Sequence, residues 1–236
     1  AGKLGFDDTV KQGYDAKELD SSTVPARALA AIRSVVAFTT NDLATATLQM
    51  QPYLSNGCIV ADGGQLRWKE GTNQQSGYIT IDTPGTKAVV GFANGVRNTL
   101  GDVTITPACP YAAVYVSAQG KQESVENAQR LVIVAMSRAR NTGMRFNKAE
   151  DTLLDVGTAP VMLEPVNATI TLRREGVFKV IALNHDGMRT TTTIPVEAGT
   201  FMLDGARDKT PFYLIEFATP EPDAEVLDEA ATADEN

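Results

Sequence analysis

Short apolar runs rich in Val, Ile, Thr and aromatic residues follow one another from residue 53 to residue 217, and Gly, Pro and Asn separate them. In the run GYITIDT at 77–83, Ile79 and Ile81 would point to one side of an extended chain and the residues between them to the other. The run ATITL at 168–172 repeats the pattern. A period of two residues predicts strands with one buried face.

The run LVIVAM at 131–136 is continuously apolar, which predicts a central strand flanked or covered on both faces. Dipeptides suited to tight reversals, such as Asn56-Gly57, stand between the runs. No long helical pattern separates them, which disfavours a parallel α/β sheet. For residues 53–218 we therefore predict an all-β fold, an antiparallel β-sandwich that is jelly-roll-like.

Residues 21–50 carry the one persuasive helical pattern of the chain. Leu29, Ile32 and Val36 recur at helical spacing, and Ser, Thr and Pro residues suited to a helix start precede them. A helical lead-in or connector is therefore predicted for residues 1–52.

The formal net charge of −8 is concentrated at the C-terminal end. Residues 219–236 hold seven acidic residues and no Lys or Arg, which leaves 22 acidic against 21 basic residues elsewhere. Because this segment has few apolar residues, we predict an acidic, disordered tail. The nearly neutral body offers no broad basic field, so nucleic acid and membrane are not expected as partners. No apolar run approaches the roughly 20 residues of a membrane-spanning helix.

Cys58 and Cys109 form no CxxC pair and have no histidines at zinc spacing, so a metal site built on them is disfavoured. The spacing leaves a disulfide in an exported protein and two separate thiols equally open. No cofactor is expected, although a structural calcium ion near the turns stays open. The carboxylates considered for it are Asp62, Asp82, Asp102 and Asp204.

Side chains able to do chemistry are few. The one histidine, His185, stands beside Asp186, but neighbours on a strand or turn point in different directions, so a polar residue entering a hairpin turn is the favoured interpretation. GxSxG and phosphate-loop motifs are missing. Glu164 and Glu216 could form an acid pair, which hydrolysis requires about 5 to 10 Å apart, but each is better explained as a surface or structural charge. No catalytic residue is predicted.

A sugar-binding surface needs an aromatic ring and polar groups for hydroxyls. The stretch QLRWKEGTNQQSGY holds the one tryptophan together with such groups. The candidate carbohydrate-binding residues are Trp68, Arg67, Asn73, Gln75 and Tyr78. A lone Trp in a sandwich is more often a packing residue, and this alternative for Trp68 stays open.

Six pieces of the sequence stand in a distinctive order. They are LRW (66–68), GYITIDTPGTKAVVGF (77–92), RLVIVAMSRARNTGMRFN (130–147), GTAPVMLEPVNATITL (157–172), FKVIALNHDGMRT (178–190) and PFYLIEF (211–217). Together they resemble the C-terminal β-sandwich region that follows the (βα)8 catalytic domain in large bacterial glycoside hydrolases of the cellulase-like superfamily. The resemblance implies an exported polysaccharide-degrading enzyme whose catalytic acids lie on the barrel. This chain has no barrel, so no catalytic residue is carried over.

From these features we expect a noncatalytic accessory module of a secreted or cell-surface glycoside hydrolase, packed on the catalytic domain and able to contact polysaccharide. The alternatives are a stand-alone carbohydrate-binding module and a structural jelly-roll subunit of a coat, shell or surface layer. Hydrolysis by this chain alone ranks behind them. The oligomeric state stays open, and the start at Ala1 without a signal segment is interpreted as that of a mature or trimmed product.

Overall fold

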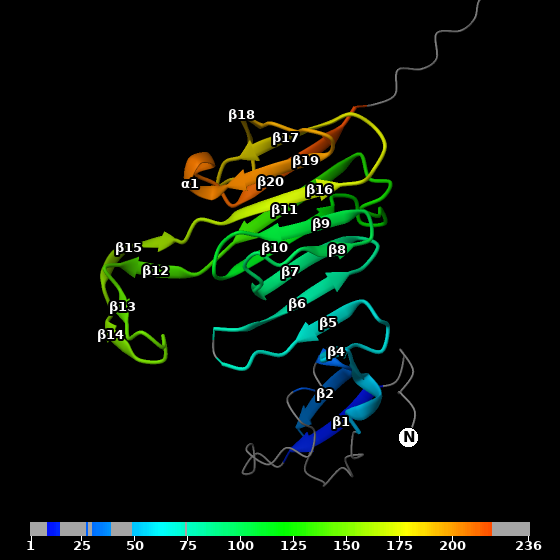
Figure 1. Ribbon diagram of the computed structural model, residues 1–236, viewed down its shortest axis with the longest axis vertical. Helices are drawn as coiled ribbons and strands as arrows, with labels where there is room; N and C mark the ends of the chain where they lie inside the picture. Colours follow the sequence, from blue (N-terminus) through cyan, green and yellow to red (C-terminus); the bar gives the residue numbers. More distant parts are fainter. Residues whose placement is uncertain (1–8, 15–26, 28–29, 39–48, 74, 219–236) are drawn as a thin grey trace, which may run out of the picture.

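Two antiparallel sheets of very different size make up most of the protein. The computed structural model describes residues 9–14, 27, 30–38, 49–73 and 75–218 (Figure 1). The predicted antiparallel β-sandwich is confirmed, since every pairing between strands within the two sheets is antiparallel. No helix among these residues is long and apolar enough to cross a membrane.

The larger sheet has ten strands in the order β18-β17-β20-β11-β10-β7-β6-β5-β4-β3. Their bounds are β3 (Leu54–Ser55), β4 (Cys58–Val60), β5 (Leu66–Lys69), β6 (Gly77–Asp82), β7 (Thr86–Phe92), β10 (Ala112–Ala118), β11 (Arg130–Met136), β17 (Phe178–Leu183), β18 (Arg189–Ile194) and β20 (Phe212–Phe217). The smaller sheet has four strands in the order β19-β16-β9-β8. Their bounds are β8 (Asn98–Leu100), β9 (Val103–Pro107), β16 (Asn167–Leu172) and β19 (Thr200–Asp204).

The hydrophobic core lies between the two sheets. Val114, Ile133 and Ile215 of the larger sheet are fully buried in one cluster with Ile105 and Ile170 of the smaller sheet. These residues occupy alternate positions of their strands, so each strand contributes one face to the core. The alternation predicted for residues 168–172 is the same feature, with Ala168, Ile170 and Leu172 buried. In residues 77–83 the strand alternates as predicted, but Ile79 and Ile81 are half-buried on the face away from this core, and Thr80 is the buried residue.

Strand β11 contains the continuously apolar run at 131–136 and lies inside the larger sheet, between β20 and β10. Leu131 and Ile133 are fully buried on the core side, whereas Val132 and Val134 on the outer side are half-buried. The prediction of a central strand is confirmed, with its outer face less completely covered than its inner face.

The larger sheet extends beyond the smaller one. Strand β8 is the edge strand of the smaller sheet, and it lies against β6 and β7. Beyond β6 the larger sheet continues through β5, β4 and β3, as the lower half of Figure 1 shows. We call these four strands, β3 to β6, the overhang. Since the smaller sheet ends at β8, it covers the inner face of the larger sheet only as far as β6.

The turn between β3 and β4 has the tight backbone reversal that the dipeptide Asn56-Gly57 predicts. Asn56 and Gly57 have φ angles of 50° and 72°, and Ser55 pairs with Cys58 directly across the turn. Two consecutive residues with positive φ reverse the chain with the twist that antiparallel strands require, and Asn-Gly is the dipeptide that adopts it most readily.

Residues 137–164 leave the sandwich as a separate ribbon, which we call the arm. Strand β12 (Ala139–Thr142) pairs with β15 (Thr158–Leu163), and β13 (Arg145–Phe146) pairs with β14 (Leu153–Asp155). Figure 1 shows the arm projecting to the left of the two sheets and then turning downward at β13 and β14.

The structure corrects the predicted helical lead-in at residues 33–38, whereas Arg27 and Ala30 have 3-10 helical conformation. Residues 33–38 form strand β2 (Arg33–Phe38), which pairs in parallel with β1 (Thr9–Tyr14), and a single 3-10 turn follows at Gln51–Tyr53. The segment RSVVAF contains adjacent β-branched residues, whose side chains lose rotamer freedom in a helix and suit a strand. The predicted capping residues, Leu29 and the acidic tail at 219–236 lie outside the described residues.

Candidate functional site

A cleft of about 460 Å³ lies where the edge of the smaller sheet meets the overhang. Its volume falls in the range of roughly 300 to 1,000 Å³ that small-molecule sites occupy. Residues of β4, β5 and β6 form one side and residues 97–100 at β8 form the other. We call it the overhang cleft, and its main polar lining residues are Arg67, Lys69, Tyr78, Asp82, Arg97 and Thr99.

The pairing of β5 with β6 brings the lining residues of these strands together. Arg67 lies opposite Thr80, and Lys69 lies opposite Tyr78. Because successive side chains of a strand point to opposite faces, these four share the inner face of the overhang. The Lys69 Nζ atom lies 5.8 Å from the centroid of the Tyr78 ring, within range of a cation–π contact.

Tyr78 occupies its position because the residue opposite it on β7 is a glycine. Gly91 pairs with Tyr78 and has a φ of 126°, a conformation that side-chain-bearing residues rarely adopt. A Cβ atom at position 91 would stand 2.8 Å from the Tyr78 Cα atom and 3.0 Å from its Cβ atom. Any other residue there would displace Tyr78 from the wall of the cleft.

The charges in the overhang cleft do not cancel. The Lys87 ammonium, whose side chain is 6% exposed, donates a hydrogen bond of 2.6 Å to the Asp82 carboxylate, and this pair is neutral as a unit. Arg67 and Arg97 form no ion pair or hydrogen bond through their side chains among the described residues, and Lys69 has no carboxylate partner there. Three uncompensated cations therefore line one cleft.

The structure separates Trp68 from the two candidate residues that lie in the cleft. Arg67 and Tyr78 line it, whereas Trp68 points to the opposite face of β5. There Trp68 pairs with Ile59 and packs against a buried cluster that contains Ile59 and Tyr53. This position supports the packing alternative for the tryptophan.

Asn73 and Gln75 stabilise the loop between β5 and β6 instead of lining the cleft. The Asn73 Oδ1 atom accepts a hydrogen bond of 2.8 Å from the Gln75 backbone amide. The Gln75 side chain donates to the carbonyl oxygen of Ala149 at 3.2 Å, which connects this loop to the arm. Of the five candidate residues, the structure thus brings two together in one site.

Two cleft residues, Lys69 and Arg97, were not among the sequence candidates. A signal for Lys69 was present, because a period of two along LRWK places it on the same face as Arg67. Arg97 reaches the cleft from the other sheet, and no local pattern indicates which strand a neighbouring sheet will place there.

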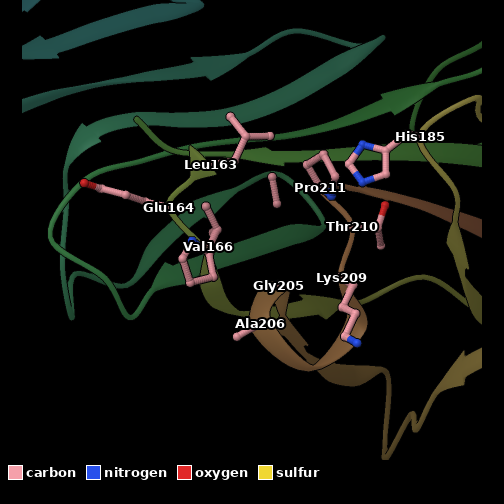
Figure 2. Close-up of a pocket in the computed structure, with 11 residues that line it drawn as sticks. Leu163, Glu164, Val166, His185, Gly205, Ala206, Lys209, Thr210 and Pro211 are labelled. Carbon is pink, nitrogen blue, oxygen red and sulfur yellow. The ribbon is translucent and has the colours of Figure 1, made fainter. Parts of the chain in front are cut away.

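A second depression, of about 260 Å³, holds the single histidine (Figure 2). It lies beside the short helix α1 (Gly205–Asp208), and His185 and Thr210 stand on one side of it. Figure 2 shows the Glu164 carboxylate directed away from His185. His185 belongs to the β17–β18 turn, where the Asn184 side chain accepts hydrogen bonds from the backbone amides of Asp186 and Met188 at 3.0 and 2.8 Å.

The two acids considered for hydrolysis are separate and each is engaged by cations. Glu164 pairs with Arg138 at 2.8 Å and with Arg140 at 3.1 Å. Glu216 pairs with Arg189 and, at 3.4 Å, with Lys179. The two carboxylates also line different depressions. Their surroundings fit structural charges.

Both cysteines carry free thiols, so the structure selects the second alternative. Cys58 lines the overhang cleft. Cys109 lies near Tyr111, and burial raises the pKa of its thiol. No group of three or more His, Cys, Asp or Glu in the described part of the chain could hold a metal ion. Of the carboxylates considered for calcium, Asp204 caps α1 and Asp82 pairs with Lys87.

The chain was also compared with known families, curated proteins and solved structures. No family model, no curated protein and no solved structure matched it significantly, so its function is inferred from its own residues.

Proposed function

We propose that this chain is a noncatalytic β-sandwich accessory module of a secreted polysaccharide-degrading glycoside hydrolase. In this proposal the arm packs against the catalytic domain, and the overhang cleft contacts glycan. The observation that carries the proposal is the exposed apolar surface of the arm.

Half of the large apolar side chains that are exposed in the described residues lie between positions 153 and 163. They are Leu153, Leu154, Val156, Val161, Met162 and Leu163, which are 41% to 63% exposed. A two-stranded ribbon is marginally stable in water, and contiguous exposed apolar side chains mark interaction surfaces. Covering them would contribute on the order of 1 kcal/mol for each side chain.

The base of the arm is held in place before any partner binds. Arg138 and Arg140 each pair with both Glu150 and Glu164, in a closed set of four ion pairs. The Arg140 guanidinium also lies over the Phe146 ring, 4.5 Å from its centroid. A preorganised surface loses less conformational entropy on binding than a mobile one. This geometry suits a permanent contact with a neighbouring domain.

The test begins with the gene region that encodes the residues before Ala1, which should specify a (βα)8 domain with its own pair of acids. In the two-domain protein, Val161→Asp and Leu154→Asp should lower the Tm of the module by several degrees, because each places a charge in the apolar contact. The isolated chain should keep its Tm, since both side chains are largely exposed there. Differential scanning calorimetry of both proteins measures this.

Met202→Asp is the matched control. Met202 is 60% exposed, as apolar as the arm residues, and lies on β19, away from the arm. It should leave both proteins unchanged. Equal effects of arm and control variants in the two-domain protein, or the lack of a catalytic domain in the gene, would contradict the proposal.

A stand-alone carbohydrate-binding module is the second candidate, and the overhang cleft favours it. This candidate requires that the isolated chain bind glycan, and it predicts that substitutions in the arm leave glycan binding unchanged. Size-exclusion chromatography of the isolated chain distinguishes these two functions from that of a structural subunit. A structural subunit would form large assemblies, which Val161→Asp should disrupt.

A further inference from the structure

We propose that the overhang cleft binds a segment of an acidic polysaccharide, with Tyr78 beside a sugar ring and Arg67, Lys69 and Arg97 around its carboxylate or sulfate group. The saccharide part of this proposal rests on the proposed function. The preference for an anion rests on the cleft alone.

The three cations differ from the arginines that have a structural role in this protein. Arg138, Arg140 and Arg189 each contact a carboxylate. Arg67, Lys69 and Arg97 line one cleft and have no carboxylate partner among the described residues. Like charges gathered in a concave site repel one another, and an anion bound between them relieves this repulsion.

The shape and remaining chemistry of the cleft suit a sugar unit. Tyr78 is half-buried, so one part of its ring packs on the sheet and another part faces the cleft. Thr99 on β8 is exposed on the other side, and its hydroxyl, which lies 3.4 Å from that of Thr104, keeps hydrogen-bonding capacity for a ligand. Arginine can bind a carboxylate or sulfate with two parallel hydrogen bonds, which adds orientation to the charge attraction.

The charge of the whole chain argues against nucleic acid as the ligand. Duplex DNA carries one charge per roughly 1.7 Å and is held by many cations. The cleft offers three in a chain whose net charge is −8. A uronate chain carries one charge per sugar unit, which a small cluster of cations can neutralise locally.

Affinity electrophoresis of the full chain tests the proposal, in native gels that contain polygalacturonate, dextran sulfate or uncharged dextran. Polygalacturonate or dextran sulfate should retard the chain, according to whether the anion is a carboxylate or a sulfate, and dextran should not. The double variant Arg67→Gln/Arg97→Gln should weaken this binding at least about tenfold, because each arginine contributes charge-assisted hydrogen bonds. Both side chains are exposed, so the Tm should not change.

Two controls make the test specific to the cleft. Lys121→Ala removes an exposed cation between β10 and β11 and should leave binding unchanged. Cys58 lines the cleft, so bound polymer should slow its reaction with a disulfide reagent, whereas Cys109, outside the cleft, should react at the same rate with and without polymer.

Each contrary result overturns the proposal. These are no retardation by either acidic polymer, equal loss of retardation in Lys121→Ala, binding of dextran that survives the arginine substitutions, or tighter binding of a DNA oligonucleotide than of the polysaccharides. The isolated chain is used and the arm is unaltered, so these results are independent of the calorimetry on the two-domain protein.

Discussion

Tyr213 is a fully buried tyrosine whose hydroxyl group has found partners inside the protein. It donates a hydrogen bond to Asp208 Oδ2 at 3.1 Å and lies 3.3 Å from the Thr210 carbonyl oxygen. Burial, followed by the charge of Asp208, raises the pKa of the phenol well above its usual value of about 10. The folded protein therefore strongly favours the neutral hydroxyl.

This shift predicts how stability depends on alkaline pH. Because the folded pKa is raised, the stabilising contribution of Tyr213 is present below pH 10 and is lost as the pH rises above the unfolded value of about 10. Tyr213→Phe should cost about 1 kcal/mol at pH 7 and should flatten the decline above pH 10. Urea unfolding between pH 7 and 11 measures both.

Tyr115→Phe is the control, since Tyr115 lies on neighbouring β10 and is half-buried. It should retain the decline of the unaltered protein. The assignment to Tyr213 fails if Tyr213→Phe loses stability above pH 10 as steeply as the unaltered chain.

At the scale of single residues, strand alternation predicts which side chains share the cleft. The alternation that placed Ile79 and Ile81 on one face also separates Arg67 and Lys69 from Trp68. Residue type favours Trp68 as a sugar-stacking residue, whereas alternation places it on the face opposite Arg67, where it packs. Sequence proximity grouped Asn73 and Gln75 with it, although a loop places its side chains independently of the strand face.

Among the elements, the arm depends on the ion pairs at its base. Burial by itself lowers the pKa of the Arg138 guanidinium, but hydrogen bonding to Glu164 and the charges of Glu164 and Glu150 outweigh this and raise it. Glu164 also accepts a hydrogen bond of 3.3 Å from the Ser137 hydroxyl. Several polar contacts to one carboxylate thus hold the two ends of the arm together at its base, and the Ser137 hydroxyl also donates to the Tyr111 carbonyl oxygen of the sandwich at 2.8 Å.

Glu164→Gln should loosen the arm without unfolding the sandwich. The ion pairs are about one-third exposed on the carboxylate side, so we expect a loss of about 1 kcal/mol, or about 2 to 4 °C in Tm. Hydrogen exchange should accelerate at the amides of β12 and β15 and stay unchanged in β11 and β16. Glu126→Gln, an exposed acid without a cationic partner among the described residues, is the control and should change neither measurement. Acceleration spread evenly over both sheets would contradict this role.

Element type was predictable where one signal dominated. The apolar run at 131–136 forms a central strand because its length and β-branched residues leave few alternatives. In the segment at 33–38, helical spacing of apolar residues competed with β-branched content, and pairing with a distant strand decided the outcome. Such long-range pairing carries no local signal.

At the scale of the whole molecule, Trp68 joins the N-terminal part to the end of the larger sheet. It packs on the cluster of Ala31, Tyr53 and Ile59. Because the indole is half-buried, Trp68→Ala should cost about 2 kcal/mol and lower the Tm by about 4 to 8 °C. Retardation by acidic polysaccharide should persist, since the side chain faces away from the cleft.

Leu66→Ala is the matched control on the same strand and face, and it should cost less than Trp68→Ala because Leu66 is 36% exposed. If Trp68→Ala instead abolished retardation at an unchanged Tm, Trp68 would be a sugar-stacking residue and the packing role would be wrong.

The sandwich could be predicted from strand periodicity, but the overhang cleft could not. It exists because ten strands face four, and the chain contains no local signal for how many strands each sheet receives. Arg67 on β5 and Arg97 beside β8 are thirty positions apart in the sequence, yet both line the overhang cleft.

The difference in strand number also separates the edge of the smaller sheet, which can change in length, from the core, which stability requires. A fifth strand added beside β8 would cover the inner face of β5 and β6 and close the overhang cleft. A shorter β8–β9 hairpin would instead widen the cleft into a flat surface. Neither change touches the residues buried between β9, β16 and the middle of the larger sheet. Ligand size could thus be reshaped, by evolution or by engineering, through one peripheral hairpin.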